Sequence, residues 1–217
     1  MTEKIVFALD IGSKYTGYAL LKVNKNNELN IFDYGTISFD INIPEELYVY
    51  ENAKLLKQFI KEKISLFPND KVVVLVEHQK SDFLERNMRF KNTKKKQKNL
   101  NITKQISLLV QNFLFDEGID FAYIEAYKQN GNGWIQILSN SYYPNNTNLY
   151  ENLLQLLKNP KINFYPSAQK EEMINKLTNY IEIWKKTHKN ISSIVNYLDA
   201  IAMSLVFILY ANYIKSS

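Results

Sequence analysis

The stretch KIVFALDIGSKYTGYALLKV, residues 4–23, decides the fold. Its first half is an apolar run that ends at Asp10-Ile11-Gly12, the pattern of a buried strand that stops at a carboxylate. Its second half predicts another strand from Thr16 to Val23, and a third is expected from Leu29 to Phe39 after the turn-forming Asn24-Lys25-Asn26-Asn27. The chain is therefore predicted to open with a three-stranded meander.

Helical and strand patterns alternate downstream of the meander. The unbroken β-branched run from Val72 to Val76 predicts a central strand that is buried on both faces and ends at Glu77. Residues 128–148 are rich in Asn, Gly and Ser and predict a loop or small insertion. A second strand is expected at Ile119 to Ala126, and helices are expected at Pro44 to about Leu66, Ile102 to Leu114, Leu149 to Leu157, Ser167 to about Lys186, and Ser192 to Ile214.

Composition limits both the architecture and the chemistry. The 217 residues are 46% hydrophobic and 13% aromatic, and no repeat or linker divides them, so we expect one domain over residues 1–217. Without cysteine, the chain cannot be a disulfide scaffold, a thiol enzyme or a thiolate zinc protein. Its two histidines, His78 and His188, exclude a multi-histidine metal site. Any metal would be held mostly by oxygen ligands, as Mg²⁺ or Mn²⁺ is.

One segment carries the basic charge. The net charge is +5, and residues 80–104 alone contribute +7, from nine basic residues against Asp82 and Glu85. A basic segment on a nearly neutral body indicates a polyanion partner, most simply nucleic acid. The alternative is a solvated lysine-rich loop. The nine residues are Lys80, Arg86, Arg89, Lys91, Lys94, Lys95, Lys96, Lys98 and Lys104.

The expected localisation is intracellular, in the cytoplasm or at a viral replication site, and not secreted. The first residues lack the apolar run and cleavage site of a signal peptide. The apolar stretch Ile194 to Ile214 contains Asp199, which would cost about 2.5–3.5 kcal/mol near the centre of a membrane span. A buried helix is the better interpretation, so no membrane partner is expected.

Three carboxylates stand at positions where a buried charge is costly. Asp10 and Glu77 each end a strand, and Asp199 interrupts the most apolar helix. Singly, each could be a turn residue, a surface strand end or a hydrogen-bonded carboxylate. If the two strands are adjacent and parallel, their carboxyl ends bring Asp10 and Glu77 together, and the last helix can add Asp199. Such a cluster predicts a divalent-cation site and the two-metal chemistry of nucleases.

Three sequence blocks carry a family resemblance. DIGSKYTGYA (residues 10–19), VLVEHQ (74–79) and NYLDA (196–200) resemble, in order, the motif blocks of the RuvC-like Holliday junction resolvases, including the poxvirus-type branch. The resemblance implies an RNase H-like α/β fold, with a mixed five-stranded sheet flanked by helices. It also implies a homodimer that nicks opposed strands of a four-way DNA junction, with two Mg²⁺ or Mn²⁺ ions per site and no nucleotide cofactor.

The same resemblance assigns the metal ligands. Asp10, Glu77 and Asp199 match motif positions, whereas the family usually has Asp or His where this chain has Asn196. Residues 196 and 199 are three apart on a helix and can share one face. Asn196 is either a natural neutral oxygen ligand or an inactivating Asp→Asn substitution, and in both cases it can weaken or abolish activity.

The basic segment follows Glu77 directly, and within a resolvase it would track DNA phosphates into the site. Phe83 could stack on bases at the junction centre, or pack against the following helix. The remaining DNA-binding candidates are Lys80, Arg86, Arg89, Lys91, Lys94, Lys95 and Lys96.

Three other functions compete with a resolvase. An actin-like or sugar-kinase-like ATPase shares the Asp-x-Gly turn, but it needs a second lobe and a second phosphate turn. A non-catalytic junction-binding relative would tolerate Asn196. Another RNase H-like nuclease would share the carboxylates and differ in its loops.

Overall fold

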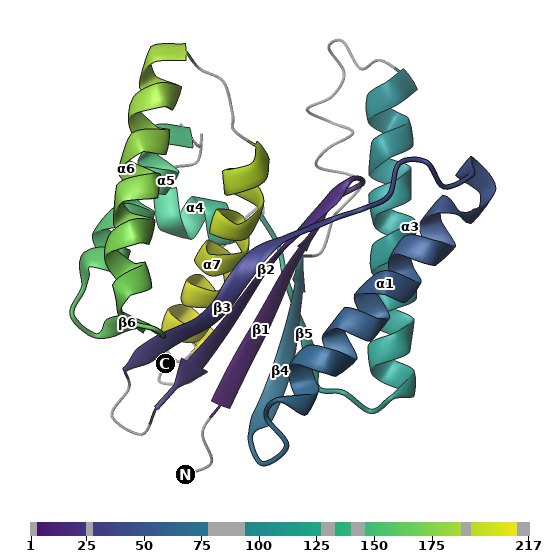
Figure 1. Ribbon diagram of the computed structural model, residues 1–217, viewed down its shortest axis with the longest axis horizontal. Coiled ribbons are helices and arrows are strands. Elements are labelled where there is room, and N and C mark those ends of the chain that lie inside the picture. The colour runs from purple at the N-terminus through teal and green to yellow at the C-terminus, as the bar shows by residue number, and fades with distance from the viewer. Residues whose placement is uncertain are drawn as a thin grey trace.

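The computed structural model describes residues 4–24, 28–77, 94–126, 133–139, 146–187 and 192–211. Its strands form a six-stranded mixed sheet in the order β5-β4-β1-β2-β3-β6 (Figure 1). The strands are β1 Lys4–Ile11, β2 Tyr15–Val23, β3 Leu29–Ser38, β4 Lys71–Glu77, β5 Phe121–Ile124 and β6 Ile162–Phe164. The helices are α1 Glu45–Ser65, α3 Lys94–Asp116, α4 Trp134–Ser139, α5 Asn146–Lys158, α6 Ala168–Thr187 and α7 Ser192–Ala211.

The predicted three-stranded meander is confirmed. β1 pairs antiparallel with β2, and β2 pairs antiparallel with β3. The turn between β2 and β3 is closed by two bonds from Asn24, whose backbone N–H donates to the Glu28 carbonyl and whose Nδ2 donates to Glu28 Oε2 at 2.7 Å. β4 then pairs parallel with β1, and its unbroken apolar run fits the predicted central strand buried on both faces.

Helices cover both faces of the sheet, with α1 and α3 on one side and α4 to α7 on the other (Figure 1). Successive side chains of a strand point to opposite faces, so β1 contributes Phe7 and Leu9 to the core under α1 and α3. It contributes Val6 and Ala8 to the core under α4 to α7. A central strand that serves two cores must be apolar at nearly every position, which the sequence of β1 satisfies.

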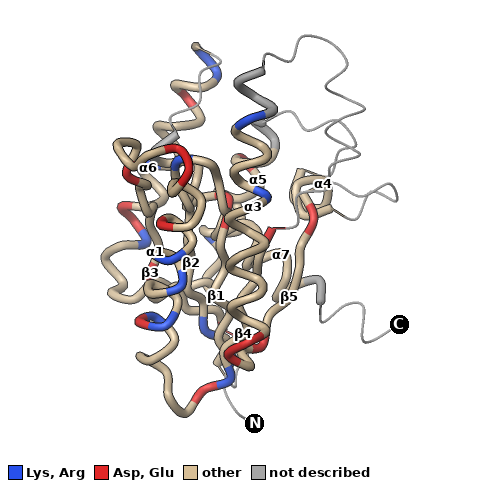
Figure 2. Tube along the Cα trace, turned by 90° about the vertical axis from the view of Figure 1, so that its right-hand side faces the viewer, with Lys and Arg blue, Asp and Glu red and all other residues tan. Residues whose placement is uncertain are grey.

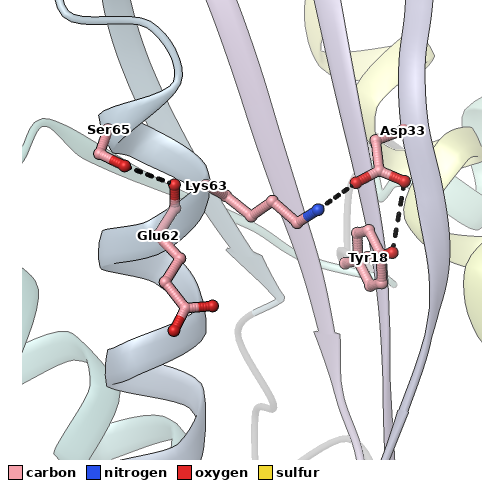
Figure 3. Close-up of polar contacts among 5 residues, drawn as sticks. All are labelled: Tyr18, Asp33, Glu62, Lys63 and Ser65. Carbon is pink, nitrogen blue, oxygen red and sulfur yellow. Dashed lines mark hydrogen bonds and ion pairs between the residues drawn. The ribbon is translucent and has the colours of Figure 1, made fainter.

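A polar and aromatic contact fixes α1 to the sheet. Lys63 of α1 reaches an ion pair with Asp33 of β3, and the Tyr18 hydroxyl of β2 donates to the same carboxylate at 3.3 Å (Figure 3). The Lys63 ammonium also lies over the rings of Tyr18 and Phe59, at 5.6 and 5.2 Å from their centroids. A Cβ at position 35 would lie 3.0 Å from the Tyr18 side chain, so Gly35 leaves room for this ring.

The sheet has six strands, where five were expected. The additional strand, β6, pairs parallel with β3 over three residues, too few for a periodicity to be visible in the sequence. The expected loop at 128–148 contains the short helix α4 and the start of α5. Helix α3 begins at Lys94 and not near Ile102, because its first turns are lysine-rich and carry no apolar period.

The helix expected at the end of the chain is confirmed as α7. It packs against β1, β2 and β3, and Leu198, Ile201 and Leu205 are fully buried. Within the described ranges, no helix is long and apolar enough to cross a membrane. Basic and acidic residues are interspersed over these ranges (Figure 2).

Candidate active site

The site begins where β1 and β4 end side by side. The parallel register of the two strands runs to Leu9 opposite Val76, so the next residues along are Asp10 and Glu77. Strand alternation places Asp10 on the same face as Ala8, and Glu77 on the same face as Leu75, which is the face covered by α7. The two strands are thus adjacent and parallel, which is the condition under which the sequence brings Asp10 and Glu77 together.

Gly17 brings the last helix to this point. Residue 17 pairs with Asp10 across the β1–β2 ladder. A Cβ at position 17 would lie 1.9 Å from the backbone oxygen of Asn196, so only glycine permits this approach of α7 to the sheet. The contact places the Asn196 turn of α7 over the strand beside Asp10, and Asp199 follows one turn later.

The three carboxylates lie near enough to one another to affect each other's pKa. Loss of water around the Asp10 carboxyl raises its pKa well above the ordinary value, and repulsion from Glu77 and then Asp199 raises it further. Burial also raises the pKa of Asp199 to about 7, against a hydrogen bond from Tyr150 that lowers it and with Glu77 repulsion that adds to the rise. The three groups therefore share one electrostatic environment.

Two aromatic donors hold two of these carboxylates. The Tyr150 hydroxyl of α5 donates to Asp199 Oδ1 at 2.8 Å, and the Trp134 indole Nε1 of α4 donates to Glu77 Oε1 at 2.9 Å. Both aromatic side chains are buried, with 4% and 2% of their surface exposed. Burial next to Asp199 also raises the pKa of the Tyr150 hydroxyl, which keeps it protonated and able to donate.

Asp199 and Glu77 each accept a hydrogen bond, whereas the side-chain amide of Asn196 has no acceptor among the described residues. Its side-chain Nδ2 is buried and donates to no acceptor within the described ranges. A buried amide donor without a partner costs about 1–3 kcal/mol. The Asn196 amide is therefore a buried hydrogen-bond donor for which the described residues provide no acceptor.

The donor chemistry of the site fits a divalent cation. Three carboxylates that repel one another offer the oxygen ligands and negative charge that Mg²⁺ prefers, and Asn196 presents a buried amide one helical turn before Asp199. In the part of the chain that the structure describes, however, no three His, Asp or Glu side chains are grouped so that they could hold a metal ion. The site therefore offers suitable ligand atoms but not a preformed metal cage.

The predicted DNA-binding residues lie mostly outside the described residues. This holds for Phe83 and for Lys80, Arg86, Arg89 and Lys91. The backbone of Lys94, Lys95 and Lys96 forms the first turn of α3, and the structure does not describe their side chains. Lys98 is described, and it pairs with Glu45 of α1 at 2.7 Å.

Several solved structures have an architecture similar to that of this chain. Thermus thermophilus RuvC in complex with a Holliday junction substrate matches with a TM-score of 0.55 and 12% identity, over 96% of each chain. A second structure of Thermus thermophilus RuvC gives a TM-score of 0.53, 12% identity and the same coverage. The yeast mitochondrial Holliday junction resolvase Ydc2 gives 0.59 and 13%, over 97% of this chain and 80% of Ydc2. No family model and no curated protein matches the sequence.

The chain has a RuvC-like fold. The expectation of a mixed α/β sheet flanked by helices is confirmed, with one strand more than predicted. At 12–13% identity the likeness concerns the fold, and the chemistry must be argued from the site itself.

Three residues of the candidate active site have little or no signal in the sequence. Gly17 lies within the first motif block, and its only signal in the sequence is its place in the strand that follows Asp10. Trp134 is an aromatic residue in a polar segment that the sequence predicts to be a loop. Tyr150 lies in a helix whose apolar pattern predicts core packing, so its hydroxyl contact with Asp199 had no signal in the sequence.

Proposed function

We propose that this chain is a metal-dependent, structure-specific endonuclease that resolves four-way DNA junctions by paired symmetric nicks. One observation carries the proposal: carboxylates from β1, β4 and α7 meet at one end of the sheet, in a fold shared with a RuvC that binds a Holliday junction. We further propose that it acts as a single nuclease domain inside a cell or at a viral replication site.

The proposed ligands are Asp10, Glu77 and Asp199, with the side-chain oxygen of Asn196 as a neutral fourth. Two Mg²⁺ or Mn²⁺ ions held in this way would activate water and stabilise the charge on the phosphate during in-line displacement. The protein's own contribution is to gather the anions: the β1–β4 register aligns two of them, and the contact at Gly17 sets the third.

The proposed DNA path is the segment between the site and α3. This segment starts after Glu77, at the end of β4, and leads to Lys94, where α3 begins. Its basic residues, with Lys94, Lys95 and Lys96, would contact phosphates and position the substrate without reading its sequence. Phe83 is the proposed stacking residue.

We also propose a homodimer, because a two-fold symmetric junction is matched best by a two-fold enzyme. The outer face of α3 supports this, since Leu108 and Phe115 are 57% and 77% exposed on one side of the helix. Tyr123, on the edge strand β5, is 50% exposed and bonds to Gln111 of α3. Light scattering on the purified chain tests the dimer, and Leu108→Glu with Phe115→Glu should give a monomer.

Cleavage of synthetic DNA tests the function. A labelled four-way junction is incubated beside linear duplex and RNA–DNA hybrid, with Mg²⁺, with Mn²⁺ and with a chelator, using the unmodified chain, Asp10→Asn and Asn196→Asp. We expect symmetric junction nicks that need metal and are lost in Asp10→Asn. Cleavage of the hybrid and not the junction would identify a different RNase H-like nuclease.

A non-catalytic junction-binding protein is the second candidate, and Asn196 favours it. Position 196 lacks the charge usual at that motif position, and the described residues hold no ready metal-binding group. Tight junction binding without cleavage, by both the unmodified chain and Asn196→Asp, would establish this function in place of the nuclease.

A further inference from the structure

We propose that Tyr150 and Trp134 are positioning residues, which hold the Asp199 and Glu77 carboxylates in place for a divalent cation. The inference rests on the proposed metal site and adds two residues that ligate nothing themselves. Each donates one hydrogen bond to one carboxylate oxygen, Tyr150 to Oδ1 of Asp199 and Trp134 to Oε1 of Glu77.

The need for such donors follows from the charges. Glu77 and Asp199 both repel Asp10, and they repel each other. Like charges in a partly buried site separate unless donors or a cation compensate them. Two donors that remain in place without a cation keep the carboxylates at the site before a cation arrives.

Both donors belong to one cover over the site, formed by α4 and α5, which are hydrogen-bonded to each other and to the chain after β5. The backbone N–H groups of Trp134 and Ile135 donate to the carbonyls of Glu125 and Ala126, which ties α4 to the chain just after β5. Asn152 of α5 donates to the Leu138 carbonyl at 2.7 Å, which ties α5 to α4. The cover therefore fixes the two donors relative to the sheet.

The ring of Tyr150 is itself held in place. Tyr180 of α6 packs edge-on against it, with ring centroids 5.1 Å apart and planes at 90°. Because its ring is confined, the hydroxyl is presented to Asp199 with little loss of rotamer entropy.

The donors leave the carboxylates able to bind metal. An ionised carboxylate has about four lone-pair positions, so the bond from Tyr150 or Trp134 occupies one of them and does not by itself exclude a cation. Hydrogen bonds to metal-ligating groups orient them, and their removal typically weakens metal binding by about 10–100-fold. A purely structural bond would instead change stability and leave the affinity of the folded protein unchanged.

Mn²⁺ binding to the folded, full-length chain tests this without DNA. Affinity and stoichiometry are measured by electron paramagnetic resonance for the unmodified chain, Tyr150→Phe, Trp134→Phe and Tyr18→Phe. The last variant is the matched control, because Tyr18 also donates to an aspartate, Asp33, but on the opposite face of the sheet. We expect Tyr150→Phe and Trp134→Phe each to weaken Mn²⁺ binding by about tenfold, and Tyr18→Phe to leave it unchanged.

The outcomes separate this proposal from the one on which it rests. If the unmodified chain binds Mn²⁺ and Tyr150→Phe and Trp134→Phe bind it equally well or more tightly, the positioning role is wrong and the metal site stands. If the unmodified chain binds no Mn²⁺, the metal site and the positioning role both fail. Circular dichroism on each variant establishes that the affinity refers to folded protein.

Discussion

Replacement of Gly17 by alanine should displace α7 and open the candidate active site. The added Cβ would lie 1.9 Å from the carbonyl oxygen of Asn196, 2.2 Å from its carbonyl carbon and 2.9 Å from the backbone nitrogen of Tyr197. All three are backbone atoms, so no side-chain rotation relieves the clash. Ordinary contact begins at 3.4 Å, and the helix must therefore move by about 1.5 Å in this tightly packed region.

The expected size of the effect follows from that displacement. Overpacking of this kind typically costs about 1–3 kcal/mol of unfolding free energy. For a chain of 217 residues, a loss of about 2 kcal/mol lowers Tm by roughly 4–8 °C. Because α7 carries Asp199 and Asn196, Mn²⁺ affinity should fall as well, and any junction cleavage should fall by about 100-fold.

Two measurements and one control decide this prediction. Urea unfolding followed by circular dichroism gives the stability, and electron paramagnetic resonance gives Mn²⁺ affinity. Gly118→Ala is the control, because Gly118 has a φ of 65° and an added Cβ would meet nothing within 4 Å. It should lose about 1–2 kcal/mol through backbone strain and keep its metal affinity. A Gly17→Ala protein as stable and as metal-competent as the unmodified chain would refute the reasoning.

Four further predictions follow from the same structure. Folding raises the pKa of Asp199 to about 7, so the contribution of this group to stability is complete below its unfolded pKa near 3.8 and is lost as pH rises through 7. In the presence of a chelator, Asp199→Asn should therefore be more stable than the unmodified chain at pH 8. Urea titrations should show this difference in stability shrinking toward pH 5. Asn196→Asp should bind Mn²⁺ more tightly and, without metal, be less stable at pH 8, because it adds a fourth carboxylate; equal Mn²⁺ binding would contradict a role for position 196 in the site. Lys63→Met should lose about 1 kcal/mol through the Asp33 pair and two ring contacts, with Mn²⁺ affinity unchanged. Alanine at positions 94, 95 and 96 together should weaken junction binding and reduce the slope of log affinity against log salt by about three, as loss of three phosphate contacts requires; an unchanged slope in filter binding would place these lysines away from DNA.

Local pattern was enough for most of the elements. The apolar run ending at Asp10 and the β-branched run ending at Glu77 predicted two buried strands, because a strand covered on both faces must be apolar throughout. Parallel pairing of these strands then follows from ordinary α/β topology, and it aligns the two carboxylates. Two features could not be predicted from local pattern. Strand β6 has three residues, which is too short to show a period, and the lysine-rich start of α3 lacks an apolar period.

The amino-acid sequence by itself determined which groups can carry the chemistry. Without cysteine and with two histidines, any metal must be held mainly by oxygen, and the carboxylates at 10, 77 and 199 are the candidates. Tertiary structure alone decided what surrounds them. The approach of α7 at Gly17 and the donors Tyr150 and Trp134 join residues far apart in the chain. A glycine or an aromatic residue has many ordinary uses in a fold, and only the packing of α4, α5 and α7 on the sheet gives these three a place at the site.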